Sequence, residues 1–191
     1  QLAEAFIDYA GTCMNLDNME DAYDFLDKAT RLLRNFPDDR LVARLTCREG
    51  YMYLHYSNYS KAIELLLEAD KKIRALPAPI ELKDRYFLTL IHSGLGKIYE
   101  RNDDHEKSVR AYLKVVDMCE AMGMRTRLSW HYLNVGNGYL ALSDHKNAES
   151  YFRKAIDVAD DISQQARAAA YANVGYCYIE KKQYESALEL F

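Results

Sequence analysis

The chain has 191 residues, of which 49% are hydrophobic, and it contains only 8 glycines and 3 prolines. So few turn-forming residues exclude the many tight turns of an all-β sandwich or barrel and favour long helices. The formal net charge of −4 lacks the basic excess typical of nucleic-acid-binding domains, and no apolar run approaches the roughly 18 residues of a membrane span.

Five segments repeat one pattern along the chain. In the template, an aromatic or large residue is followed four positions later by a small residue and three positions after that by an aromatic. A second stripe of small and large residues comes after a turn. The copies, in chain order, are Phe6, Ala10, Cys13, Ala22, Leu26 and Ala29; Thr46, Gly50, Tyr53, Ala62, Leu66 and Ala69; His92, Gly96, Tyr99, Ser108, Tyr112 and Val115; Tyr132, Gly136, Tyr139, Ala148, Phe152 and Ala155; and Tyr171, Gly175, Tyr178, Ala187 and Phe191.

The spacing places each set of positions on one stripe of a helix. A glycine inside a helix costs about 1 kcal/mol relative to alanine, so its recurrence at the small position indicates a packing role. We predict that it lets the second helix of each hairpin approach, with small residues facing large ones. The aromatics Tyr53, Tyr99, Tyr139 and Tyr178 are then packing residues.

Ten helices are expected, the last one truncated. The second helix of a hairpin should start after a short polar residue that accepts hydrogen bonds from its free N–H groups, as Asn18, Asn58, Asp104 and Asp144 can, with Gln183 less suited. Breaks between hairpins are expected where helix-stopping residues collect, near Pro37, around Pro77 and Pro79, near Gly123, and from Asp161 to Ser163.

This pattern resembles the tetratricopeptide repeat over essentially the whole chain, most closely in the segments 132–155 and 171–191. Glu49, where a buried aliphatic residue is expected, and Cys13, where an aromatic is usual, depart from it. The period near 40 is longer than the common one of about 34. It is similar to that of kinesin light chain and of bacterial regulators with helical-repeat sensor domains. HEAT and armadillo repeats share the period but not the Gly, Tyr and Ala template.

The resemblance implies an all-α, right-handed superhelical solenoid of about five antiparallel hairpins. We expect one array over residues 1–191, with hairpins at about 2–36, 38–76, 80–122, 125–161 and 164–191. Because the chain starts at Gln1 and ends within a periodic segment at Phe191, we expect it to be a fragment of a longer protein.

In this family the first helix of each hairpin lines a concave binding surface. The slot after the small residue holds Gly11, Tyr51, Lys97, Asn137 and Tyr176, and the slot two residues before it holds Asp8, Arg48, Gly94, Asn134 and Asn173. The candidate partner-binding residues are Arg44, Arg48, Tyr51, Lys97, Asn134, Asn137, Asn173 and Tyr176.

Alternatives stay open for several of these residues. Arg44 and Arg48 lie one helical turn apart and could grip a carboxylate, or could belong to a solvated, salt-bridging face. Asn134 and Asn137 belong to the ordinary consensus of the repeat. The chaperone-binding members clamp a terminal carboxylate, but Ile7 and Gly11 stand where the first Lys and Asn of that clamp are expected. Trp130 either anchors a partner or packs between hairpins.

No catalytic motif is evident, and we expect no cofactor, no metal and no enzyme activity. His105 and His145 occupy the same turn position as Tyr59 and Tyr184, while His55, His92 and His131 lack an evident carboxylate or cysteine partner. Asp103 with Asp104, and Asp160 with Asp161, read as helix-terminus residues. The widely spaced Cys13, Cys47, Cys119 and Cys177 are expected to be reduced core thiols, which favours the cytoplasm.

The sequence therefore predicts a scaffold that binds a protein or peptide on its concave face, without nucleic acid or membrane as a partner. It fits the sensory or regulatory segment of a signalling protein. The competing hypothesis is a switch that responds to a small ligand or signalling peptide by changing superhelical pitch.

Overall fold

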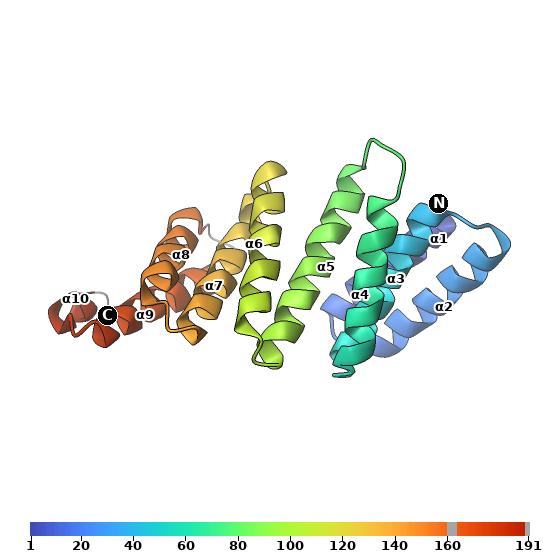
Figure 1. Cartoon of the computed structure of the whole chain (residues 1–191). Helices are drawn as coiled ribbons and strands as arrows, with labels where there is room; N and C mark the ends of the chain where they lie inside the picture. The colour runs from blue at the N-terminus through green and yellow to red at the C-terminus, as the bar shows by residue number, and fades with distance from the viewer. Residues whose placement is uncertain (160–163, 190–191) are drawn as a thin grey trace. The chain divides into compact units, whose positions relative to one another are not determined.

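The computed structural model describes residues 1–159 and 164–189, and this part of the chain is helical without any strand. Figure 1 shows its ten helices. They are α1 (Leu2–Asn15), α2 (Met19–Asn35), α3 (Asp39–His55), α4 (Tyr59–Arg74), α5 (Leu82–Arg101), α6 (His105–Ala121), α7 (Arg125–Ala141), α8 (His145–Val158), α9 (Gln164–Glu180) and α10 (Tyr184–Leu188). Among the described residues no helix is long and apolar enough to cross a membrane.

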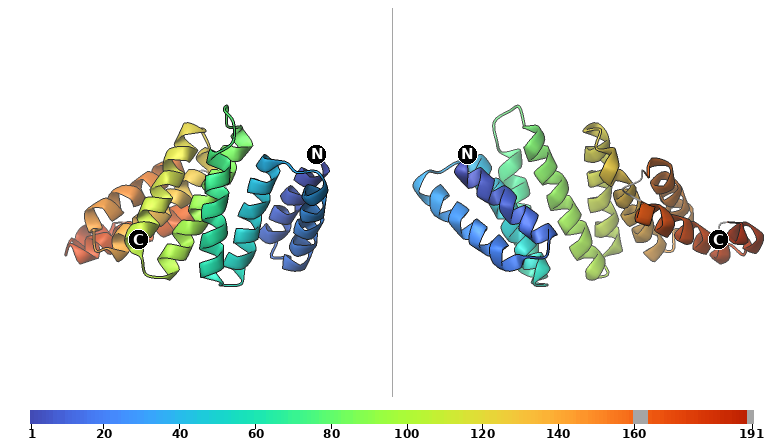
Figure 2. Two further views of the ribbon diagram at one scale, coloured as in Figure 1. Left: turned by 45° about the vertical axis from the view of Figure 1, so that its right-hand side comes forward. Right: turned by 180° about the vertical axis from the view of Figure 1, so that it is seen from behind.

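The helices belong to two compact units, residues 1–98 and residues 99–191. Within the first unit, short turns join α1 to α2 and α3 to α4 as antiparallel hairpins, and within the second they join α7 to α8 and α9 to α10 (Figures 1 and 2). The expected all-α class is confirmed. The expectation of a single array over the whole chain stays a prediction.

Side-chain caps begin the second helices where the sequence predicted them. The cap residue accepts a hydrogen bond from the backbone N–H three positions later in four cases, Asn18, Asn58, Asp104 and Asp144. Gln183, at the start of α10, makes no such bond. Each cap satisfies one of the free donors at a helix N-terminus and so fixes where the helix starts.

The residue before each cap has a left-handed backbone, with φ between 58° and 59° at Asp17, Ser57, Asp103, Ser143 and Lys182. This conformation lets the N–H of the cap residue reach back to a carbonyl near the end of the preceding helix, as from Asn58 to Tyr53 at 2.9 Å. The same hydrogen bond closes the other four turns. One turn geometry therefore recurs in every hairpin.

Small residues on the first helix do face large residues on the second, as predicted. A Cβ added to Gly136 would lie 2.4 Å from a ring carbon of Phe152, and one added to Gly50 would lie 3.0 Å from Leu66. The small residues of the second helices, such as Ala62 and Ala148, are fully buried. Gly50 and Gly136 are thus explained by close helix packing.

Three of the cysteines, Cys47, Cys119 and Cys177, are buried, and all four are free thiols. Burial raises the pKa of the Cys47 thiol to about 12 and makes it an inert core residue. The expected core position is met by the three buried cysteines, whereas Cys13 is half-buried. The predicted break at Asp161 to Ser163, the Asp160 and Asp161 pair, and the repeat position Phe191 lie outside the described residues.

Candidate functional site

Arg44 on α3 is buried inside the first unit, with only 1% of its surface exposed. Its guanidinium donates hydrogen bonds to Asp84 at 2.8 Å, to Glu4 at 2.8 Å and to Glu81 at 2.9 Å. The prediction that Arg44 contacts a partner is therefore wrong. The alternative is right about salt bridges, which Arg44 forms with three carboxylates, but wrong about a solvated face, because the side chain is buried. Carboxylates from α1 and from the start of α5 already occupy its donors.

Further charges extend this ion-pair network. Lys83 donates to Glu4 at 2.7 Å and to Asp8 at 2.6 Å, while Asp84, which has no exposed surface, also lies 3.2 Å from Nε of Arg40. The hydrogen bond from Lys83, opposed by burial and aided by the neighbouring positive charges, lowers the pKa of Glu4. The network links α1, α3 and α5, so Asp8 has a structural partner as well.

Arg48, one turn after Arg44, is placed differently. Its guanidinium lies over the ring of Phe87, 5.0 Å from the centroid, and a Cβ added to Gly11 would be 2.3 Å from its Cζ. Gly11 therefore provides the space that the guanidinium fills. Among the described residues no hydrogen bond or ion pair is formed by Arg48, and its Nε is buried without an acceptor. Such a cation remains able to bind a carboxylate.

The other two candidates of the first unit differ in exposure. Tyr51 is half-buried against Gly94, and its hydroxyl donates to the backbone carbonyl of Leu90 at 2.7 Å. This bond ties α3 to α5 and gives Tyr51 a structural role. Lys97 is exposed on α5.

In the second unit, three predicted residues come together around one pocket of about 620 Å³. Asn137 on α7 and Asn173 and Tyr176 on α9 line it, together with Glu100, His145 and Glu180. Nδ2 of Asn173 donates to Oδ1 of Asn137 at 2.9 Å. Because each amide carries both donors and acceptors, the pair has further capacity to bond an incoming backbone.

The lining of the pocket combines amide, carboxylate and phenol side chains. Tyr176 is exposed and hydrogen-bonds Glu180 one turn later, which raises the pKa of the phenol. Glu100 adds a second carboxylate. Together, the amides, the phenol and the carboxylates around this pocket can hydrogen-bond both the N–H and the C=O groups of a peptide. The carboxylates can also attract a basic side chain.

Sequence reasoning missed Glu100, Glu180 and His145 as lining residues. The spacing of Tyr176 and Glu180, four positions apart on one helix face, is the pattern that could have indicated their contact. Asn134 is half-buried one turn before Asn137 and is not among the residues that line the pocket. Trp130, near the start of α7, is 41% exposed, which leaves its ring open to a partner.

The histidines are mostly structural. His105 and His145 are the first residues of α6 and α8, as Tyr59 and Tyr184 are of α4 and α10, which confirms the predicted turn position. The expectation that His55 and His92 lack a carboxylate partner is wrong, because Nε2 of His92 lies 3.2 Å from Asp70 and Nδ1 of His55 lies 3.7 Å from Asp17. Within the described ranges no three metal-ligating side chains are grouped so as to hold an ion.

A family model described as Tetratricopeptide repeat matches residues 87–161 and 127–191. No curated protein matches the chain. Among solved structures, 98% of the chain matches a signal transduction ATPase with numerous domains from Pyrococcus horikoshii, which carries a tetratricopeptide repeat sensor, at 22% identity and a TM-score of 0.72. A Rap protein in complex with competence and sporulation factor matches 97% of the chain at 20% identity and a TM-score of 0.65. Kinesin light chain-type repeats from Podospora anserina match 98% at 12% identity and a TM-score of 0.69.

The chain spans 29% of the ATPase, 50% of the Rap protein and 90% of the kinesin light chain-type protein. At these identities the likeness shows the fold alone. It agrees with the predicted solenoid of tetratricopeptide type, including the likeness to kinesin light chain.

Proposed function

Because the chain belongs to the tetratricopeptide repeat family, we propose that it is a protein-interaction module that binds an extended peptide segment of its partner at the pocket between α7 and α9. The observation that carries this proposal is the meeting of Asn137, Asn173 and Tyr176 around one pocket of about 620 Å³. The sequence alone had selected all three as inward-facing. The role proposed is binding and not catalysis.

The chemistry of the pocket favours a peptide backbone as the bound group. The two amides offer donors and acceptors side by side, and Tyr176 adds an exposed ring that a side chain of the peptide can cover. Glu100 and Glu180 favour a basic residue at the same place. Arg48, in the first unit, offers a separate contact for an acidic residue of the partner, and Lys97 remains a candidate contact.

The proposed setting is the sensory or regulatory segment of a larger signalling protein in the cytoplasm. Support comes from the free cysteines and from the relatives in which such arrays occur, including the sensor of the Pyrococcus protein.

Selection of peptides from a random display library on the purified chain tests the proposal. We expect selected peptides to be enriched in Lys or Arg and to bind at least tenfold more weakly to Asn137→Ala and Asn173→Ala, because each loses bonds to the peptide backbone. Asn147→Ala is the matched control, since Asn147 is exposed on α8 of the same unit and is not among the residues that line the pocket. Equal binding by all three variants would place the peptide elsewhere and refute the site.

A second candidate function, a switch that responds to a signalling peptide, is favoured by the fold shared with the Rap protein solved with competence and sporulation factor. Arrays with nearest-neighbour contacts can change shape on binding. Small-angle scattering with and without a selected peptide separates the two functions, because a switch changes the radius of gyration and a rigid scaffold does not.

A further inference from the structure

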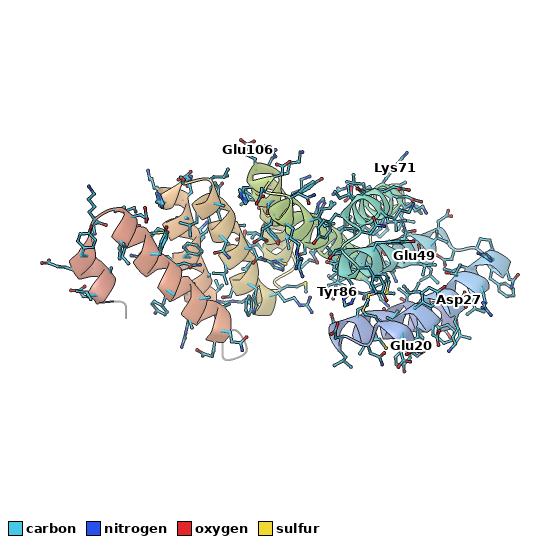
Figure 3. All side chains as sticks on the ribbon, turned by 90° about the horizontal axis from the view of Figure 1, so that it is seen from below. Glu20, Asp27, Glu49, Lys71, Tyr86 and Glu106 are labelled. Carbon is cyan, nitrogen blue, oxygen red and sulfur yellow. The ribbon has the colours of Figure 1, made fainter. Side chains whose placement is uncertain are left out.

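A second pocket lies on the first unit among α2, α3 and α4, and it contains one of the residues that depart from the repeat. Glu49 stands where the template has a buried aliphatic side chain. In the structure it is half-buried and lines a pocket of about 460 Å³. Figure 3 shows Glu49 on α3 and Asp27 on α2, which lines the same pocket.

The carboxylate of Glu49 has no protein partner among the described residues. The two nearby lysines are engaged elsewhere, since Lys61 donates to Glu64 at 2.6 Å and Lys72 forms an ion pair with Glu68 at 2.7 Å. Burial, opposed by the charge of Lys72, raises the pKa of Glu49. A carboxylate that is partly withdrawn from water and left without a counter-ion favours the arrival of a cation.

Aromatic rings supply the rest of the pocket. Tyr23 from α2 and Tyr53 and Tyr56 from α3 and its C-terminal turn line it, and the three are between 39% and 64% exposed. The sequence-based expectation that Tyr53 is a packing residue is therefore only partly met. Leu26 and Met52 add apolar lining. The faces of aromatic rings carry negative charge density and attract cations.

The charge around the pocket is on balance negative. Asp27 also lines it and is paired with the exposed Arg31 at 2.7 Å, while Lys61 lines it and is paired with Glu64. Of the three charged residues that line the pocket, Glu49 is the one without an ion-pair partner among the described residues. A hydrophilic metal ion is not favoured by an apolar and aromatic lining, whereas an ammonium ion with alkyl substituents matches both the rings and the carboxylate.

We propose that the pocket formed by Glu49, Tyr23, Tyr53 and Tyr56 binds an alkylated ammonium group. Glu49 supplies the counter-charge and the tyrosine rings contact the methyl groups. Alkylated ammonium groups occur both in small quaternary amines and in the methylated lysine side chains of proteins. This site is independent of the pocket between α7 and α9.

The test is a calorimetric titration of the full chain with choline chloride at constant ionic strength. The uncharged isostere 3,3-dimethylbutan-1-ol has the same shape without the charge. We expect saturable choline binding with a Kd of about 1 mM or tighter, equivalent to about −4 kcal/mol, and at least tenfold weaker binding of the isostere. Equal affinity for the two compounds, or no binding of choline, would overturn the proposal.

Two variants locate the binding. Glu49→Gln keeps the shape of the side chain and should weaken choline at least tenfold, while Glu20→Gln removes the same charge from an exposed position of α2 that does not line the pocket and should change Kd less than twofold. Far-UV circular dichroism checks that both variants are folded. An equal effect of the two would reduce the binding to general electrostatics and contradict the site.

The source of the cation is distinguished by competition. A short peptide carrying trimethyllysine should displace choline if the group belongs to a protein partner, and its unmethylated counterpart should not. Displacement by neither peptide assigns the site to small amines. Asn137→Ala serves as a separate control, because it impairs the proposed peptide site and should leave choline binding unchanged.

Discussion

Replacing Gly136 by alanine should destabilise the second unit, although the same change normally stabilises a helix. Alanine gains about 1 kcal/mol over glycine in a helix interior. Here the added Cβ would lie 2.4 Å from Cε1 of Phe152, whose side chain has no exposed surface. Overpacking of a filled core costs about 1–3 kcal/mol of stability. We expect a cost at the upper end of this range, because the ring of Phe152 is fully buried. The net expectation is a loss of about 2 kcal/mol.

Gly50→Ala makes the same substitution at the equivalent position of another repeat, where the crowding is milder. Its Cβ would lie 3.0 Å from Leu66, whose flexible side chain can yield by a few tenths of an ångström. The free energy gained from the higher helix propensity of alanine should then nearly cancel the free energy lost to crowding. The two substitutions are chemically identical and should differ by about 2 kcal/mol because of the facing residue alone.

Urea unfolding followed by fluorescence measures the effect in the second unit, because the single tryptophan, Trp130, lies on α7. The double variant Gly136→Ala with Phe152→Leu should recover at least about 1 kcal/mol relative to the sum of the single changes. A stabilised Gly136→Ala variant, or single effects that simply add, would refute the packing explanation of the repeat glycines.

Three further substitutions test other parts of the chain. Arg44→Met should cost about 3 kcal/mol or more in global stability, measured by chemical denaturation, because it leaves Asp84 as a buried charge with reduced compensation. Burial, with the charge of Arg127, lowers the pKa of His131 from 6.5 to about 4. The stability that the neutral ring contributes is therefore complete above pH 6.5 and is lost as the pH falls toward 4. The unfolding free energy read from Trp130 should therefore fall less between pH 7 and pH 5 in His131→Gln than in the wild type. Ser57→Gly should raise the melting temperature, since it relieves a left-handed conformation that costs a residue with a side chain about 1 kcal/mol.

The repeat made most of the local structure predictable. Helix starts follow from Asn18, Asn58, Asp104 and Asp144, because capping depends on neighbours within one turn of the chain. The pairing of Gly136 with Phe152 follows in the same way, since both residues belong to one hairpin whose geometry the spacing fixes. Features that depend on neighbours within one hairpin can therefore be predicted from the sequence.

Contacts between hairpins were harder to predict. The partners of Arg44 lie 37 to 40 positions away, and periodicity shows which face of a helix is apolar but not which charged residues meet across it. Arg44 and Arg48, four positions apart, looked equivalent. Arg44 is the centre of a buried network, whereas Arg48 has no counter-ion in the part of the chain that the structure describes.

The pocket between α7 and α9 was predictable only in part. Asn137 and Asn173 occupy neighbouring slots of consecutive repeats, so the repeat itself brings them within hydrogen-bonding distance. Their facing inward was predictable, whereas the carboxylates beside them were not. Under the proposed function, these slots mark the place of the partner, and the chemistry around them decides which partner fits.

Departures from the repeat template carry the most specific information in this chain. A buried aliphatic position costs nothing to maintain, whereas a half-buried carboxylate such as Glu49 weakens the fold unless a cation binds. If Glu49 only filled space, Glu49→Leu would stabilise the first unit and leave every binding property unchanged. If it serves the pocket, the same substitution stabilises the fold and abolishes choline binding. Measuring stability and choline affinity on this one variant thus separates a tolerated irregularity from a functional residue.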